Sequence, residues 1–134
     1  MIKVNSLIDL LKKNNSKFYA GVPDSVLKEL SYSLQKVGKK NHIITTNEGA
    51  AVSLGIGYYL STKHVPCIYM QNSGLSNALN PLISIAHEKV YSIPLILIIG
   101  WRGSPKIKDE PQHNVKGKIT ESILKLLNIK YTII

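Results

Sequence analysis

Acid–base side chains stand in several short polar segments of this 134-residue sequence. Glu48 directly precedes the small residues 49–51, which leave space beside its carboxylate. Asp24 follows a Gly-Val-Pro turn, and His113 stands close to the acids at 109–110, whose charges would favour a protonated imidazole near neutral pH. Carboxylates and imidazoles are common general acids and bases, so Glu48, Asp24 and His113 are our catalytic candidates.

Each catalytic candidate also has a purely structural interpretation. Glu48 could be a surface residue in the first turn of a helix that Asn47 caps. Asp24 could cap the helix that follows it, a role compatible with catalysis, and His113 could be an exposed loop histidine. The other histidines lie at the edges of expected elements, and we interpret them as structural or surface residues: His42, His64 and His87.

Groups that could bind an anion follow the apolar segment 94–99. Arg102 is the only arginine among the 17 basic residues, and its guanidinium could bind an anionic group with two parallel hydrogen bonds. Lys106 and Lys108 could assist, although loop lysines are commonly solvated. We expect four residues to bind substrate: Ser25, Arg102, Lys108 and Gln112.

The elements that must position these residues alternate between strands and amphipathic helices. The periodicity predicts strands at residues 17–20, 42–46, 65–70, 94–99 and 130–134. It predicts helices over residues 3–14, from a cap at Asp24 to a stop at Gly38, over 48–61 and 75–87, and a last helix around residues 119–127. This alternation predicts an α/β fold with three layers, αβα, around a mainly parallel sheet.

In such a sheet, ligands bind beyond the carboxyl ends of the strands. The polar segments described above follow strands, so we expect them to meet at one edge of the sheet. Asn72 and Ser73 come directly after a strand, and Asn77 follows shortly behind, so their side chains could bind a ligand or terminate turns.

Composition limits the class of protein. The hydrophobic share of 44% and mean hydropathy of +0.02 are those of a folded chain with one core, and no apolar run approaches the ~20 residues of a membrane helix. The net charge of +9 suggests nucleic-acid binding as a possible function. The lysines are, however, spread over the whole sequence and form no stripe interleaved with aromatic residues. We therefore expect a cytoplasmic protein that binds neither nucleic acid nor membrane, with the lone Cys67 packed as a small apolar side chain.

Residues 48–58 read Glu-x-x-Ala-x-x-x-Gly-x-Gly-Tyr, which resembles the helix with the catalytic glutamate in the pyrimidine-binding domain of thiamine-diphosphate-dependent enzymes. Gly-Val-Pro-Asp at 21–24 resembles the early Gly-x-Pro-Gly-Asp loop of that family. Gly-Leu-Ser-Asn at 74–77 resembles its Gly-Pro-Gly-x-x-Asn loop, although it is shorter and lacks the proline. The resemblance runs from about residue 17 to the end.

Two further segments resemble particular decarboxylases of this family. Tyr-Met-Gln-Asn-Ser-Gly-Leu at 69–75 is similar to phosphonopyruvate and sulfopyruvate decarboxylases. Ile-Gly-Trp-Arg-Gly at 99–103, followed by Lys-Asp-Glu-Pro-Gln-His at 108–113, resembles the phosphonopyruvate enzymes in particular. The resemblance implies decarboxylation of phosphonopyruvate to phosphonoacetaldehyde and carbon dioxide, with sulfopyruvate as the alternative substrate and a non-catalytic fragment as the alternative role.

The resemblance also implies residue roles. Glu48 would hydrogen-bond N1' of the aminopyrimidine ring, and Asp24 or His113 would supply the proton needed after carbon dioxide leaves. Arg102 would bind the phosphonate group of the substrate. The residues implied in cofactor binding are Glu48, Gly49, Asn72, Ser73, Gly74 and Asn77.

The family binds the diphosphate through Mg²⁺ held by a Gly-Asp-Gly motif, and this sequence contains no such motif. We expect residues 1–134 to form one pyrimidine-binding domain without a metal site, incomplete at the C-terminus, where the apolar segment 130–134 ends abruptly. The diphosphate-binding domain would then lie elsewhere in the protein or on a partner subunit of an oligomer, and this chain alone would be inactive.

Overall fold

The computed structural model describes residues 3–105 and 107–134, so Lys106 lies outside the described residues. Strands β2 (His42–Ile44), β1 (Tyr19–Gly21), β3 (Cys67–Gln71) and β4 (Ile96–Gly100) form one parallel sheet in that order. The register places Gly21 opposite Ile44 on one side and Tyr69 on the other. All four strands therefore end at the same edge of the sheet, as the alternation of elements predicts.

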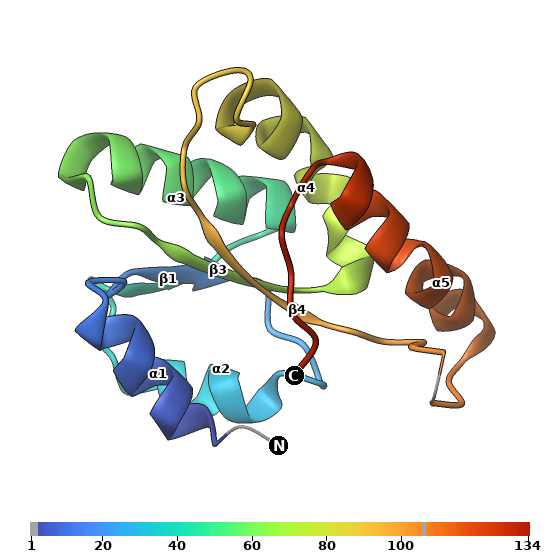
Figure 1. Ribbon diagram of the computed structural model, residues 1–134. Helices are drawn as coiled ribbons and strands as arrows, with labels where there is room; N and C mark the ends of the chain where they lie inside the picture. Colours follow the sequence, from blue (N-terminus) through green and yellow to red (C-terminus); the bar gives the residue numbers. More distant parts are fainter. Residues whose placement is uncertain (1–2, 106) are drawn as a thin grey trace.

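Helices cover both faces of the sheet (Figure 1). Helices α1 (Val4–Lys13) and α2 (Lys28–Gln35) pack on one face, and α3 (Glu48–Thr62) and α4 (Leu75–Pro81) on the other. Successive β3 side chains alternate between these layers: Cys67 and Tyr69 face α1 and α2, whereas Ile68 and Met70 face α3 and α4. The strand is buried on both faces, which confirms the expected three-layer αβα architecture.

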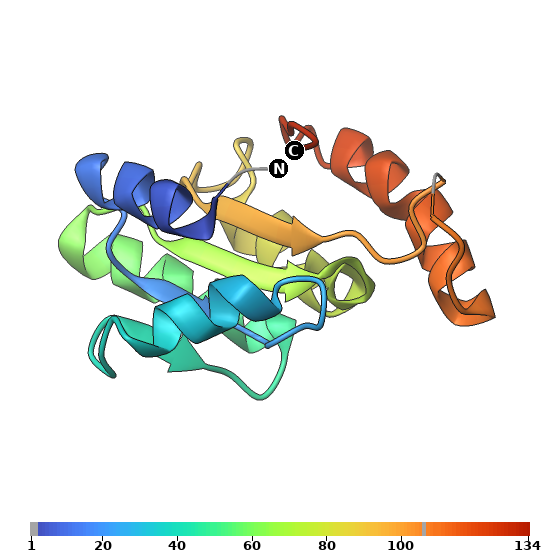
Figure 2. The same ribbon diagram turned by 90° about the horizontal axis from the view of Figure 1, so that it is seen from below.

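The last helix, α5 (Pro111–Leu126), lies beyond β4 on the side of the sheet away from β2 (Figure 2). It begins earlier than predicted because Pro111 occupies the first helical position, where a missing N–H costs nothing. Gln112 and His113 therefore belong to the first turn of a helix, and the prediction that they lie in a polar loop is wrong.

The start of α2 also differs from the prediction, since the helix begins at Lys28 and Asp24 is not its cap. The Asp24 carboxylate accepts a hydrogen bond from the Val26 N–H at 3.0 Å. This contact closes a local turn that delays the helix.

Helix α4 reaches the predicted length only with a change of geometry. Pro81 cannot donate a backbone hydrogen bond, and the helix continues after it as a single π turn over Leu82–Ala86. The chain leaves helical geometry at His87, whose backbone is extended.

Residues 130–134 have no regular structure, so the prediction of a strand there is wrong. Residues of the tail, of strand β4 and of helix α5 line one groove of about 910 Å³. None of the helices in the described parts of the chain is long and apolar enough to cross a bilayer.

Burial raises the pKa of the Cys67 thiol to about 12, as expected for an apolar site without a cation. A thiol reagent at pH 8 should therefore leave the folded chain unmodified and react fully in concentrated urea, measured by mass spectrometry. The unfolded chain is the matched control, because this is the only cysteine. Rapid modification under native conditions would contradict the buried placement.

Candidate active site

The order of the strands creates a crevice between the ends of β1 and β3. The connection from β1 leads to β2 on one side, and the next connection returns to β3 on the other side. Ligands of open parallel sheets bind where the strand order reverses in this way. The loop after β1 contains Asp24 and Ser25, and the turn after β3 contains Asn72 and Ser73, so both borders of the crevice are polar.

Glu48 begins α3, and its carboxylate is held by a side chain from the opposite helix. Asn47 caps α3 by accepting the Ala50 N–H at 2.8 Å, which leaves Glu48 half-buried in the first turn. The side-chain amide of Asn77, on α4, donates to Glu48 Oε2 at 2.8 Å. Two of the residues implied in cofactor binding, Glu48 and Asn77, thus contact each other, although 29 residues separate them.

The glycines around Glu48 occupy positions that have no room for a side chain. A Cβ atom at Gly74 would collide with the Glu48 side chain, and a Cβ atom at Gly49 would lie 2.6 Å from the carbonyl oxygen of Asn77. Within the described ranges, no protein donor reaches Glu48 Oε1. The Glu48 carboxylate is therefore held at Oε2, and its Oε1 is available to accept a hydrogen bond from a flat ring.

No three His, Cys, Asp or Glu side chains gather to hold a metal ion anywhere in 3–105 or 107–134.

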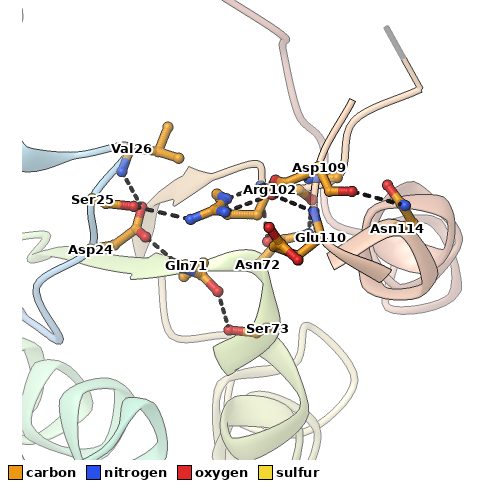
Figure 3. A network of polar contacts seen from close by, with 11 residues as sticks. Asp24, Ser25, Val26, Gln71, Asn72, Ser73, Arg102, Asp109, Glu110 and Asn114 are labelled. Atoms are coloured by element: carbon orange, nitrogen blue, oxygen red, sulfur yellow. Dashed lines mark hydrogen bonds and ion pairs between the residues drawn. The ribbon is translucent and has the colours of Figure 1, made fainter. Parts of the chain in front are cut away.

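Asp24 and Ser73 are joined across the crevice by Gln71, the last residue of β3 (Figure 3). The Gln71 side-chain amide donates to Asp24 Oδ1 at 2.6 Å, and its carbonyl oxygen accepts the Ser73 hydroxyl at 2.7 Å. Asp24 is 9% exposed, and its other oxygen accepts the Val26 N–H. Two predicted site residues therefore meet through a third that the sequence did not single out.

Asn72 ties three elements together and is buried. Its side-chain amide donates to the carbonyl oxygen of Arg102 and to the Thr120 hydroxyl, both at 2.9 Å, and its oxygen accepts the Arg102 N–H at 3.1 Å. Both amide hydrogens are used within the chain, so this side chain could offer a cofactor only the second lone pair of its oxygen. Cofactor binding by Asn72 stays a prediction, and the observed contacts are structural.

Arg102 is paired with Asp109. Its Nε and Nη2 donate to the two carboxylate oxygens at 2.7 and 2.6 Å, and its Nη1 donates to the Ser25 hydroxyl at 3.2 Å. The Arg102 guanidinium holds the pKa of Asp109 well below its usual range, helped by the N–H groups of Glu110 and Gly103. The parallel hydrogen bonds that we expected Arg102 to give a substrate are thus occupied, and one N–H each on Nη1 and Nη2 remains for a ligand.

The remaining predicted residues lie outside this network. Lys108 and Gln112 are exposed, and within the described ranges their side chains make no hydrogen bond or ion pair. His113 is half-buried in the first turn of α5, where its backbone carbonyl approaches Gly103 and its ring has no hydrogen-bonding partner among the described residues. Their predicted catalytic or substrate contacts therefore stay predictions.

Sequence reasoning missed three residues of the site, Gln71, Lys116 and Thr120, and it expected Asp109 to act on His113, whereas Asp109 pairs with Arg102. Gln71 ends a strand, a position that could have marked it. Lys116 donates to the carbonyl oxygen of Ser73 at 3.4 Å, and Thr120 bonds Asn72, because α5 brings one face against the turn after β3. No sequence signal shows which face of α5 turns inward.

The substitution Asp109→Asn should lower the melting temperature at neutral pH, because it leaves the Arg102 guanidinium without its counter-charge. The folded pKa of Asp109 is lowered, so its stabilisation is present above the unfolded value of about 3.9 and is lost as pH falls through the lower folded value. The difference from wild type should therefore shrink below about pH 4, measured by circular dichroism.

The matched control is Asp9→Asn, on the exposed face of α1. A melting-temperature difference for Asp109→Asn that does not change with pH would rule out the ion pair as its cause.

Comparison with known proteins identifies the family of the chain. The family described as "Thiamine pyrophosphate enzyme, N-terminal TPP binding domain" matches residues 3–123. Phosphonopyruvate decarboxylase of Streptomyces viridochromogenes is 38% identical over 115 residues, covering 86% of this chain and 28% of that protein. Sulfopyruvate decarboxylase subunit alpha of Methanocaldococcus jannaschii is 32% identical over 124 residues, covering 92% of this chain and 71% of that protein.

A solved structure shares the fold. Benzoylformate decarboxylase of Polynucleobacter necessarius superposes with a TM-score of 0.61 at 22% identity, over 79% of this chain and 19% of that chain. The chain spans only 28% of the length of the phosphonopyruvate decarboxylases that it matches. The family match over residues 3–123 and the sulfopyruvate decarboxylase relative, 71% of which is covered, show that this chain belongs to the thiamine pyrophosphate enzymes, as their N-terminal TPP-binding domain.

Proposed function

We propose that the protein containing this chain is a thiamine-diphosphate-dependent decarboxylase that converts phosphonopyruvate to phosphonoacetaldehyde and carbon dioxide. The observation that carries the proposal is the Glu48 carboxylate, fixed by Asn77 at one oxygen and open at the other, beside a glycine that leaves it room. The 38% identity to a phosphonopyruvate decarboxylase supports this choice of substrate.

Thiamine diphosphate, when bound, supplies a nucleophilic carbon that adds to the 2-oxo group of the substrate. Glu48 Oε1 would accept a hydrogen bond from the pyrimidine nitrogen N1' and hold the proton shared with it. Gly49 and Gly74 would leave room for the ring, and Ser73 and Asn77 would border it. Asn72 fixes the turn after β3 through its hydrogen bonds to Arg102 and Thr120.

Asp24 and His113 are the proposed proton donors for the step after carbon dioxide leaves. Asp24 lies in the crevice, whereas His113 would approach from α5. The phosphonate of the substrate would accept a hydrogen bond from Arg102 Nη1 and another from Ser25, which lie 3.2 Å apart. Contacts of Lys108 and Gln112 with the substrate stay predictions, because both side chains are exposed and lie outside the hydrogen-bond network.

The diphosphate and Mg²⁺ are bound, in this proposal, by a second domain or by a partner subunit. Relatives named sulfopyruvate decarboxylase subunit alpha, at 32–34% identity, support a partner subunit and favour sulfopyruvate as the second candidate substrate. Sulfonate and phosphonate are both tetrahedral oxyanions that the same donors could accept.

The substitution Glu48→Gln should reduce carbon dioxide release by at least about 10²-fold in the enzyme assembled with its diphosphate-binding domain, because an amide cannot exchange a proton with the ring. Release is measured with phosphonopyruvate, thiamine diphosphate and Mg²⁺, and circular dichroism checks the fold. Glu29→Gln is the control, since Glu29 occupies the first turn of α2 but is exposed. Near-normal turnover of the Glu48 variant would refute the mechanism, and no release by the wild type would favour a non-catalytic fragment.

The substitution Arg102→Met should raise KM for phosphonopyruvate by about 10- to 100-fold and change KM for pyruvate little, because pyruvate lacks the second acid group. Each substrate is assayed with wild type and variant, and sulfopyruvate is included. Pyruvate turnover serves as the internal control for loss of the Asp109 pair. Equal losses for all three substrates would show that Arg102 does not bind the acid group.

A further inference from the structure

We propose that Gln71 is a positioning residue that fixes the Asp24 carboxylate in the candidate active site, through a side-chain relay that ends at Ser73. The relay consists of Asp24, Gln71 and Ser73, joined by hydrogen bonds of 2.6 and 2.7 Å (Figure 3). The inference rests on the proposed function, because a catalytic role of Asp24 belongs to it.

The register of the sheet places Gln71 beside Asp24. Gly21, the last residue of β1, pairs with Tyr69, so β3 extends two residues further than β1. The end of β3 therefore projects alongside the loop that follows β1 and carries Asp24. The Gln71 side chain spans the space between strand end and loop at the crevice where the strand order reverses.

The chemistry of the amide fixes its orientation. The NH₂ group of a glutamine can only donate and its oxygen can only accept. The Ser73 hydroxyl donates to the oxygen, and the NH₂ donates to Asp24. A reversed amide would set its oxygen against a carboxylate oxygen, so the observed orientation is the one in which both contacts are attractive.

The Asp24 carboxylate needs this second anchor. The Val26 N–H binds Oδ2 only, and a carboxylate held at one oxygen can still rotate about its Cβ–Cγ bond. The Gln71 amide holds Oδ1 and removes that freedom without adding a charge. Among the residues that the structure describes, no lysine or arginine forms an ion pair with Asp24, so the Val26 N–H and the Gln71 amide are the contacts that orient its carboxyl group.

The relay also links Asp24 to the surroundings of Glu48. Ser73 lies in the 3₁₀ turn Asn72–Gly74, and Gly74 packs directly on the Glu48 side chain. A shift of this turn would therefore displace both carboxylates together. A misplacement of about 1 Å in a reacting group can reduce turnover about 100-fold.

The test uses Gln71→Met, which keeps the length of the side chain and removes both hydrogen bonds, in the enzyme assembled with its diphosphate-binding domain. We expect kcat for phosphonopyruvate to fall about 10- to 100-fold with KM changed less than about threefold. Gln35→Met, exposed on α2, is the matched control. In an Asp24→Asn background the Gln71→Met substitution should not lower kcat further, because Gln71 acts through Asp24.

Gln71→Glu gives a signature that a merely structural role would not produce. A carboxylate in place of the amide repels Asp24 at neutral pH, and the pair accepts a shared proton as pH falls. The activity of this variant relative to wild type should therefore rise toward acid pH. A constant ratio across the pH range, or a further loss from Gln71→Met in the Asp24→Asn background, would overturn the proposal.

A measurement without turnover separates this inference from the proposed function. The side-chain amide signal of Gln71 in a ¹⁵N-labelled chain, assigned by its loss in Gln71→Met, should move in both Asp24→Ala and Ser73→Ala. A wild-type enzyme that releases no carbon dioxide while this signal moves would refute the proposed function and leave the relay standing. An active enzyme whose Gln71 signal stays in place in both variants would refute the relay alone.

Discussion

The parallel pairing of β3 with β1 on one side and β4 on the other is the constraint on which the rest of the molecule depends. Its hydrogen bonds fix a register in which Tyr69 lies opposite Gly21 and Gln71 opposite Gly100. Because of this register, the loops after β1, β3 and β4 lie at the same edge of the sheet. Because β3 side chains are packed on both faces, a slip of one residue would exchange two buried layers, so the register is strongly specified.

The polar residues at this edge divide into those that build the site and those that remain available to a ligand. Asn72 and Asp109 form their hydrogen bonds within the chain. Asn72 holds the ends of β3 and β4 against α5, and Asp109 fixes the Arg102 side chain. Glu48 Oε1 and Arg102 Nη1 retain capacity for hydrogen bonds. A pre-organised frame of this kind lowers the entropy cost of arranging reactive groups.

The expected three-layer architecture and the place of Glu48 at the start of a helix were predictable because both follow from local patterns. Alternating strands and helices imply a parallel sheet, and a small-residue frame after a glutamate implies close approach to it. The start of α2 was mispredicted because the Asp24 side chain bonds the backbone before the helix begins. The strand expected at 130–134 is not formed: strand pairing depends on a neighbouring backbone, and the described sheet consists of β2, β1, β3 and β4 alone.

By itself, the sequence determined the fold class, the family and the segments that form the edge of the site, since short motifs and the spacing of apolar residues express these locally. Only the tertiary structure decided which side chains meet across that edge. The contact of Gln71 with Asp24 joins residues 47 positions apart, and that of Asn72 with Thr120 joins residues 48 apart. Such pairs depend on strand register and on the inward face of α5, which no local pattern encodes.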